Sequence, residues 1–324
     1  MSPKKVLVSG AAGFIGRWSV PPLIAAGYEV HAVSRTPPRA LPPQLRGAVL
    51  HRVDLLDDGA SEALVARVQP SHLLHFAWLA TPGIYWASPD NDRWLAASRH
   101  LLRRFHAHGG TRAVMAGTCA EYDWAGSGVC TEGSSALADE GAASVAPYAR
   151  CKLAMQRALE DFGSLNHLST AWGRVFFQYG PDEHPERLVA SVIAHLLKGE
   201  EAPCSHGRQI RGFLHVADVG AAFAALLDSR VEGPVNIGSD ERRAVGEVLG
   251  EIARQIGRPE LIRLGARNAH PDEPPLLIAD VARLRAEVGW RPRFTLGAGL
   301  ADTVEWWRQH LREQVSAPSG SASR

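Results

Sequence analysis

Tyr148 and Lys152 are the two residues of this sequence whose types and spacing best suit proton transfer. Residues four apart on a helix lie on the same face, so the phenol and the ammonium group would be neighbours. A phenol titrates at about pH 10, and an adjacent ammonium group lowers that value by favouring the phenolate. We therefore expect Lys152 to lower the pKa of Tyr148, which could then exchange a proton with a substrate oxygen. The pair predicts chemistry at a carbon that carries a hydroxyl or a ketone.

A third polar group, the hydroxyl of Thr118, follows a predicted strand over residues 113–116. In a doubly wound sheet, the carboxyl end of a strand lies at the mouth of the ligand crevice. Thr118 could therefore hydrogen-bond the same substrate oxygen as Tyr148 and stabilise its charge. For a threonine taken alone, a simple cap of the following turn is the alternative interpretation.

A glycine-rich segment, residues 10–16, follows a predicted strand at 5–9 and opens a predicted helix that reaches Ala26. Glycine lets the backbone turn tightly and approach a pyrophosphate, and the helix N-terminus supplies free N–H groups. The alternative is a tight turn that binds no ligand. The placement predicts a dinucleotide site, with the cofactor contacted by Gly10, Gly13, Phe14, Ile15, Gly16, Phe76 and Ala77.

The end of the second predicted strand, at residues 29–33, bears on the choice of dinucleotide. An acidic residue there usually binds the ribose 2′-hydroxyl of NAD, but this chain has Ser34 and Arg35. Because an arginine can hold a 2′-phosphate, NADP(H) is the preferred cofactor and NAD(H) the alternative. Asp54 and Leu55, after the third strand, could meet the adenine, although a plain turn aspartate is nearly as good an interpretation.

The predicted elements alternate between strands and helices over the first half of the chain. They are strands at 5–9, 29–33, 48–53, 73–76, 113–116 and 169–177, and helices at 62–68, 94–108 and 148–162, besides the helix after the glycine loop. This order predicts an α/β fold built on a doubly wound parallel sheet of the Rossmann type. Pro21 and Pro22 fall inside the first helix and predict a kink or a restart there.

The second half is punctuated by prolines and predicts a smaller C-terminal α/β lobe that binds the substrate. We expect a NAD(P)-binding Rossmann domain over residues 1–173, with 210–237 contributing. The substrate-binding lobe is expected mainly over 174–315, and a disordered tail over 316–324.

Charge and cysteine usage exclude several kinds of partner. The 324 residues carry a formal net charge of +1 with interspersed charges, so neither nucleic acid nor a membrane is an expected partner. The four cysteines lack zinc-type spacing, so no metal site is expected. Reduced thiols and the lack of a recognisable signal peptide predict a cytoplasmic protein.

Together, the glycine loop, Thr118 and the Tyr148–Lys152 pair resemble the extended branch of the short-chain dehydrogenase/reductase superfamily, which contains nucleotide-sugar epimerases, dehydratases and reductases. The resemblance runs from Val6 to about Trp307. It implies that Arg211, whose guanidinium fork suits the role, contacts the pyrophosphate of a nucleotide-sugar substrate, and that the protein is a homodimer. Further matching segments are Tyr179-Gly180-Pro181, Arg211-Gly212-Phe213-Leu214-His215-Val216-Ala217-Asp218-Val219, Asn236-Ile237-Gly238 and Gly289-Trp290-Arg291-Pro292.

Departures from the branch narrow the prediction. Cys119 and Ala120 stand where the 4,6-dehydratases carry Asp and Glu, so we expect no acid to drive elimination of water and set a dehydratase aside. Phe177 replaces an asparagine that often touches the nucleotide phosphates. An arginine of the last lobe is replaced near His270.

Two segments outside these motifs could line a substrate pocket. Trp78 is assigned to substrate binding, and its neighbours His75, Tyr85 and Trp86 could line the pocket or pack in the core with equal chance. His184 and Arg187 follow on a predicted loop over the site, where a role in sugar recognition competes with simple exposure to solvent.

These observations predict an NADPH-dependent ketoreductase that acts on a nucleotide-activated 4-keto-6-deoxy sugar. Tyr148 would give a proton to the forming alkoxide, Thr118 would bond that oxygen, and Lys152 would position the cofactor ribose. The close alternative is an NAD-dependent nucleotide-sugar 4-epimerase, which the same three residues would serve. A distant alternative is a non-catalytic NADP-binding redox sensor.

Overall fold

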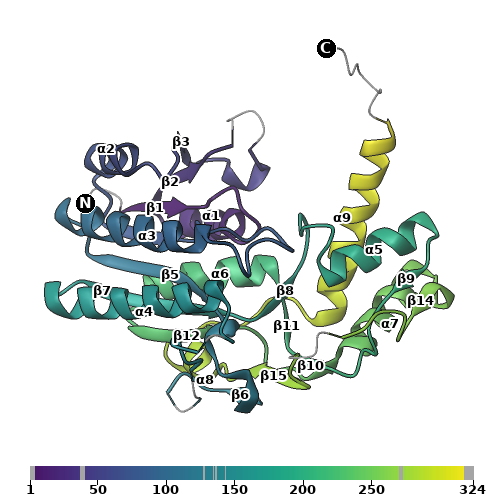
Figure 1. Ribbon diagram of the computed structural model, residues 1–324. Coiled ribbons are helices and arrows are strands. Elements are labelled where there is room, and N and C mark those ends of the chain that lie inside the picture. Colours follow the sequence, from purple (N-terminus) through teal and green to yellow (C-terminus); the bar gives the residue numbers. More distant parts are fainter. Residues whose placement is uncertain are drawn as a thin grey trace.

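Seven parallel strands form the central sheet, in the order β12-β7-β5-β4-β1-β2-β3 (Figure 1). The computed structural model describes residues 4–36, 41–126, 128–133, 135, 137–142, 144–269 and 273–316. The inner strands of the sheet are buried because helices cover both of its faces, whereas the edge strand β3 is largely exposed. The strands are β1 (Lys5–Ser9), β2 (Glu29–Ser34), β3 (Val49–Arg52), β4 (His72–His75), β5 (Arg112–Thr118), β7 (Ser169–Val175) and β12 (Gly233–Ile237).

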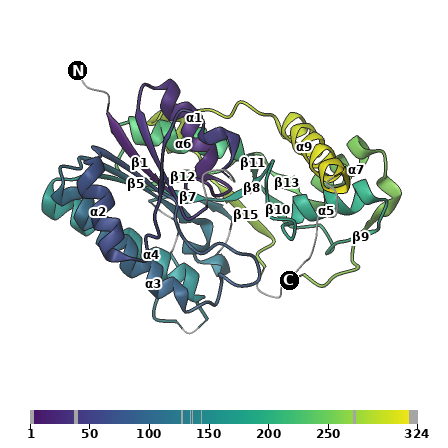
Figure 2. The same cartoon turned by 90° about the horizontal axis from the view of Figure 1, so that it is seen from above.

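Two layers of helices flank this sheet (Figure 2). On one face, α1 (Gly16–Ala25) and α6 (Val216–Asp228) pack together. On the other face lie α2 (Asp58–Val68), α3 (Asp90–Ala107) and α4 (Pro147–Asn166). The two faces bury separate apolar clusters. The predicted doubly wound Rossmann sheet is therefore confirmed.

The second lobe is built around three helices, α5 (Leu188–Lys198), α7 (Val245–Ile256) and α9 (Leu296–Ser316). They bury a third apolar cluster, and a four-stranded sheet, β13-β10-β15-β6, lies between this lobe and the main sheet (Figure 1). The remaining short elements are β6 (Val129–Cys130), β8 (Phe177–Tyr179), β9 (Ala202–Pro203), β10 (Ile210–Arg211), β11 (Phe213–His215), β13 (Arg243–Ala244), β14 (Ile262–Arg263), β15 (Leu276–Ala279) and α8 (Ala282–Ala286).

Three details differ from the prediction. Helix α1 is one element that contains Pro21 and Pro22, so the expected restart is absent; backbone bonding resumes beyond them, where Ala26 N–H donates to the Pro22 carbonyl at 3.0 Å. The predicted strand 169–177 is divided into β7 and β8. The last bond to the main sheet comes from Phe176 N–H, and β8 then pairs with β11 instead. Ser316, placed in the predicted tail, ends α9, and residues 317–324 lie outside the described chain.

No helix within the described ranges is both long and apolar enough to cross a membrane. Across the same residues, no group of three or more His, Cys, Asp or Glu side chains is arranged to hold a metal ion.

Candidate active site

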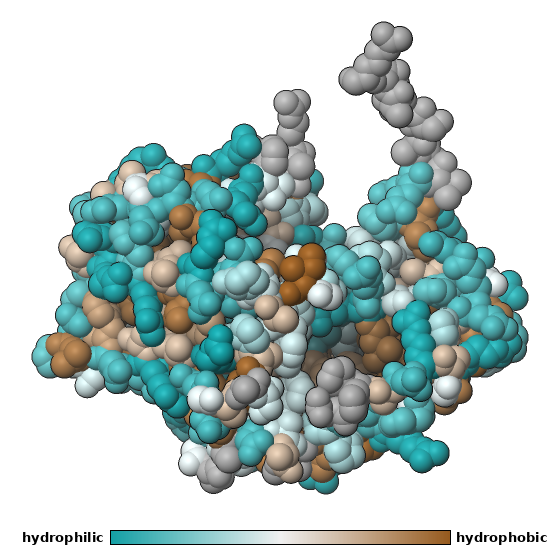
Figure 3. Space-filling model, in the orientation of Figure 1, coloured by the Kyte–Doolittle hydropathy of each residue, from teal (hydrophilic) through white to brown (hydrophobic). Residues whose placement is uncertain are grey.

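A cavity of about 580 Å³ lies where the carboxyl ends of β1, β4 and β5 face the second lobe. The molecular surface is hollowed between the two lobes (Figure 3). The strand ends, helix α4 and the loop between β8 and α5 all contribute to the cavity wall. The predicted site residues that line it are Gly10, Gly13, Phe14, Ile15, Gly16, Phe76, Ala77, Trp78, Thr118, Tyr148, Lys152, His184, Arg187 and Arg211.

The glycine loop closes one end of this cavity. Gly10 has a φ of +64°, and a Cβ atom there would lie 2.8 Å from the backbone nitrogen of Ala77. A Cβ on Gly16 would collide with the carbonyl of Gly10. The backbone therefore approaches itself and the end of β4 so closely that only glycine fits. A loop of this shape at the N-terminus of α1 fits the pyrophosphate of a dinucleotide.

Tyr148 and Thr118 both line the cavity, and the Thr118 side chain is near enough to the phenol to influence its pKa. The Thr118 hydroxyl also accepts a bond from Ala120 N–H at 3.2 Å, so this threonine is both a cap and a member of the site. Burial raises the pKa of Tyr148, the nearby Tyr85 raises it further, and the Thr118 side chain opposes the shift. At neutral pH the phenol therefore carries its proton.

Lys152 is buried beside this pair. Its Nζ donates to the Ala116 carbonyl at 2.8 Å and lies 4.0 Å from the centre of the Trp78 ring. Burial lowers the pKa of Lys152 to about 7, against the opposing effect of the Glu121 carboxylate. The expectation that Lys152 lowers the pKa of Tyr148 is wrong in this structure, because burial dominates both groups and Nζ is 6.0 Å from the centre of the Tyr148 ring.

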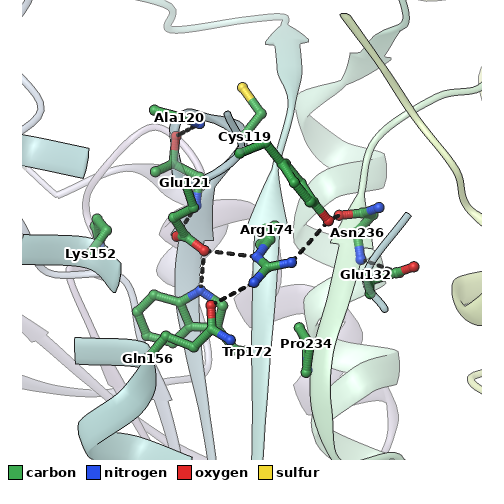
Figure 4. Close-up of polar contacts among 12 residues, drawn as sticks. Cys119, Ala120, Glu121, Glu132, Lys152, Gln156, Trp172, Arg174, Pro234 and Asn236 are labelled. Atoms are coloured by element: carbon green, nitrogen blue, oxygen red, sulfur yellow. Dashed lines mark hydrogen bonds and ion pairs between the residues drawn. The ribbon is translucent and has the colours of Figure 1, made fainter. Parts of the chain in front are cut away.

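A buried polar cluster, which the motif spacing did not indicate, lies directly behind Thr118. The Glu121 carboxylate accepts bonds from Thr118 N–H (2.8 Å), Arg174 Nε (2.8 Å) and Trp172 Nε1 (2.9 Å). Figure 4 shows Arg174 and Trp172 pointing at Glu121 from the neighbouring strand β7. Burial raises the pKa of Glu121, and the Arg174 guanidinium opposes that shift. Glu121 thus fixes the backbone of Thr118 and places negative charge near Lys152.

Tyr122 extends the cluster away from the cavity. Its hydroxyl donates to Asn236 Oδ1 at 2.8 Å and accepts from Arg174 Nη1 at 2.9 Å. Gln156 Oε1, on α4, accepts from Arg174 Nη2 at 2.8 Å. Tyr122 is 1% exposed and is a structural residue that joins the end of β5 to β7 and β12.

Four predicted cofactor residues lie outside the lining of the cavity, beyond β2 and β3. Arg35 is largely exposed and lies 3.9 Å from the Asp54 carboxylate. Ser34 Oγ accepts from Thr36 N–H at 3.0 Å, and Asp54 also caps a turn by accepting from Leu56 N–H at 3.1 Å. Leu55 is 5% exposed and packs in the core.

The wall opposite the catalytic group carries two arginines. The Arg187 guanidinium lies 5.4 Å from the centre of the Tyr85 ring, which itself stacks edge-on against Tyr148. Arg211 is 2% exposed and pairs with Glu273 at 3.0 Å. Both are therefore placed to meet an anionic substrate, although Arg211 already has a carboxylate partner. His184, also predicted here, is exposed at the rim and lines the cavity.

One acidic side chain of this wall, Glu183, was missed by the sequence analysis. It lines the cavity, although Asp182 before it and Glu186 after it do not. Cys119 and Ala120 line the cavity as uncharged residues, as expected, and Glu183 is an acid of the same cavity that lies outside those two positions. The only signal in the sequence was its place just after the Tyr179-Gly180-Pro181 segment.

The aromatic residues at and after the end of β4 lie in two places: some line the cavity, and one packs in the core. Trp78, Tyr85 and Trp86 line the cavity, as does Phe177, whose ring lies 5.0 Å from the Arg211 guanidinium. His75 does not: its two ring nitrogens bond to the hydroxyls of Ser9 (2.7 Å) and Ser98 (2.9 Å) in the core. His270 lies outside the described residues.

The sequence profile of the "NAD dependent epimerase/dehydratase family" matches residues 6–238. The chain belongs to this family. UDP-glucose 4-epimerase of Rhizobium meliloti (strain 1021) is 26% identical over 337 residues, covering 96% of this chain and 98% of the relative. dTDP-4-dehydro-6-deoxy-D-allose reductase of a Streptomyces species is 28% identical over 333 residues, covering 95% and 98%.

Solved structures of this family have the same fold. The UDP-glucose 4-epimerase of Thermus thermophilus, solved as a complex with NAD, is 27% identical with a TM-score of 0.78, covering 94% of this chain and 99% of that one. The relatives are nucleotide-sugar epimerases, dehydratases and reductases of the extended short-chain dehydrogenase/reductase type. The predicted family is therefore confirmed, and the chain is a nicotinamide-dependent enzyme of the extended short-chain dehydrogenase/reductase type.

Proposed function

We propose that this enzyme is an NADPH-dependent ketoreductase that converts the ketone of a 4-keto-6-deoxy nucleotide sugar into a hydroxyl. The observation that carries the proposal is that Tyr148, Thr118 and Lys152 line the same cavity as the glycine loop, with the Thr118 side chain beside the phenol. Two hydroxyls that converge in this way suit an oxygen that changes between ketone and alcohol. The Streptomyces reductase supports this reaction, because it aligns over 95% of the chain.

The residues divide the work as follows. The bound nicotinamide supplies the hydride. Tyr148, which burial keeps protonated, gives its proton to the substrate oxygen as negative charge develops there. Thr118 hydrogen-bonds the same oxygen and orients Tyr148. Lys152 binds the ribose hydroxyls, and Trp78 and Ala116 hold its ammonium group in place. Arg211 would contact the diphosphate of the substrate, and Arg187 would contact its sugar.

The preference for NADPH rests on Arg35. No acidic side chain ends β2, and the Arg35 guanidinium is 66% exposed, so it is accessible to a 2′-phosphate. Titration of the enzyme with NADPH and NADH, before and after Arg35→Ala, tests the assignment. We expect the variant to lose about tenfold in affinity for NADPH, as one charge-assisted contact predicts, and to keep its affinity for NADH. Equal weakening of both dinucleotides would contradict the assignment.

An NAD-dependent 4-epimerase is the second candidate. Two observations favour it: the Rhizobium epimerase covers 98% of its own length in the alignment, and Arg35 already has Asp54 as an ionic neighbour at 3.9 Å. The cofactor released from purified enzyme by denaturation separates the two candidates. Tightly held NAD would support the epimerase, whereas an enzyme that purifies without dinucleotide and then oxidises NADPH with a keto-sugar would support the reductase.

Three further expectations remain proposals. A homodimer and a cytoplasmic location are tested by light scattering and by fractionation. The non-catalytic redox sensor is the most distant candidate. Binding of NADPH without turnover of any keto-sugar would favour that sensor over an enzyme.

A further inference from the structure

Glu183 lies on the loop between β8 and α5 and is buried, with 7% of its surface exposed. The Ala190 N–H in the first turn of α5 is near enough to its carboxyl to lower the pKa of Glu183, against the larger effect of burial. The Oε2 atom, although buried, finds no hydrogen-bond partner in the described part of the chain. Glu183 is also one of the residues that line the cavity, so its unpaired carboxyl oxygen lies in the wall of the site.

The backbone around Glu183 is fixed on both sides. Glu183 N–H donates to the Gly180 carbonyl at 3.3 Å, and Asp182 has a φ of +66°, the left-handed conformation of a tight turn. The Asp182 carboxylate pairs with Arg17 at 2.6 Å. The Arg17 side chain also donates to the carbonyls of Ala12 (2.8 Å) and Gly13 (3.1 Å) in the glycine loop. The position of Glu183 is thus set before any substrate arrives.

The surroundings of Glu183 select the type of group that it can bind. Burial raises its pKa to about 8, and the Arg187 guanidinium opposes that shift. At neutral pH the carboxyl is mostly uncharged, so it can both donate and accept a hydrogen bond. A hydroxyl is the complementary group, since it can do the same. An ammonium group would meet the positive charge of Arg187 instead.

We propose that Glu183 is a specificity residue that hydrogen-bonds a ring hydroxyl of the sugar, at a carbon other than the one that reacts. The oxygen at the reacting carbon is engaged by Tyr148 and Thr118. Arg187 links the two positions, because it stands beside Glu183 and over Tyr85, whose ring is 4.8 Å from that of Tyr148 between centres. The inference rests on the proposed function, because it takes the ligand to be a nucleotide sugar.

The test compares Glu183→Ala with wild-type enzyme on dTDP-4-keto-6-deoxyglucose and on its analogues that lack the 2- or the 3-hydroxyl. We expect kcat/KM for the hydroxylated sugar to fall about 10- to 100-fold in the variant, as the loss of one hydrogen bond to a buried acid predicts. For one of the two analogues the variant and the wild type should be equal, because the partner hydroxyl is already missing. The same loss on all three sugars would overturn the proposal.

Two further variants separate recognition from folding. Glu186→Ala removes an exposed carboxylate from the same loop and should leave all three rates unchanged. Glu183→Gln keeps an acceptor and a donor in the same shape and should recover most of the activity. Water lost from the sugar in wild-type enzyme but not in Glu183→Gln would make Glu183 a catalytic acid and overturn the binding role.

The binding role of Glu183 and the proposed reduction of a keto-sugar can be tested separately. If wild-type enzyme reduces none of the keto-sugars, the proposed reaction fails, but binding of dTDP-glucose and its 2- and 3-deoxy analogues can still be measured by calorimetry. A loss of affinity in Glu183→Ala that disappears for one deoxy analogue would support the specificity role. Unchanged affinity for all three would overturn it.

Discussion

The two walls of the cavity are built differently. On the wall that we propose to be catalytic, called the catalytic wall below, Thr118, Tyr148 and Lys152 come from a strand end and one helix. Thr118 and Lys152 bond to the backbone there, and Thr118 lies beside the phenol of Tyr148. On the opposite wall, Glu183 comes from a loop and keeps a buried oxygen without a partner among the described residues. The polar groups of the first wall need no ligand as a partner, as expected for chemistry common to many substrates. The second wall keeps a polar atom that a ligand could pair with, as expected for recognition of one substrate.

Removal of the phenol from the catalytic wall should have the largest effect. Tyr148→Phe is expected to lower turnover about 10²- to 10⁴-fold, the usual range for a lost general acid. Cofactor affinity should stay the same, because Lys152 and the glycine loop are untouched. Initial rates of NADPH oxidation and a dinucleotide titration measure the two quantities. Turnover retained within a few-fold would show that this wall does not perform the proton transfer.

Loss of Glu121, which bonds the backbone behind the catalytic wall, should have the next largest effect, and that effect should be on the free energy of unfolding. Glu121→Ala leaves the Arg174 guanidinium buried without a counter-charge and should lower the free energy of unfolding by about 3–5 kcal/mol. Urea unfolding measures this change. The matched control is Glu62→Ala, which breaks an exposed pair with Arg104 (3.2 Å) and should cost under about 1 kcal/mol. Equal losses would mean that burial does not distinguish the two pairs.

The titration of Lys152 gives a pH dependence that belongs to the catalytic wall alone. Its pKa is lowered to about 7, so the ammonium form that binds the ribose is present below that pH and is lost above it. Dissociation constants for the dinucleotide should therefore rise with pH above 7, by up to about tenfold per pH unit. Lys152→Met should bind weakly with a flat profile. A rising profile in that variant would assign the effect to another group.

The ion pair between Arg17 and Asp182 joins the glycine loop to the loop that carries Glu183, and its loss should have the smallest effect. Asp182→Asn keeps a residue that tolerates the left-handed backbone but removes the ionic bond to Arg17. For a half-buried pair we expect dinucleotide affinity to fall about two- to fivefold. Asp90→Asn, which breaks the exposed pair with Arg93, is the control and should change nothing. No difference between the two variants would show that the walls are independent.

The catalytic wall could be predicted from the sequence because short-range rules define it. The turn at Gly10 and the strand end at Thr118 need only local geometry, and both lie in the cavity as expected. The Glu121 cluster could not be predicted, since its partners Trp172 and Arg174 lie 51 and 53 residues further along the chain. The lowered pKa expected for Tyr148 failed for the same reason, because burial is a property of the folded chain.

The residues of the opposite wall were only partly predicted from the sequence. Arg211 and Arg187 line the cavity as expected. Arg211 was indicated by a motif of the family that the chain resembles, and Arg187 by its place on a loop after Pro181. Glu183 was missed, since its direction depends on the left-handed turn at Asp182 and on a bond to Arg17 from the first helix. The roles of Ser34, Arg35, Asp54 and Leu55 stay predictions, because these residues lie outside the cavity lining.

The bond between Tyr122 and Asn236 has a consequence for biosynthesis. Its two ends are 114 residues apart, and Asn236 lies on β12, an edge strand and the last strand of the main sheet along the chain. While the ribosome is still translating the intervening segment, the hydroxyl of Tyr122 has only water or Arg174 as a partner. A nascent or truncated chain that stops short of β12 therefore contains Thr118, Tyr148 and Lys152. It lacks the strand whose Asn236 accepts the hydrogen bond from Tyr122.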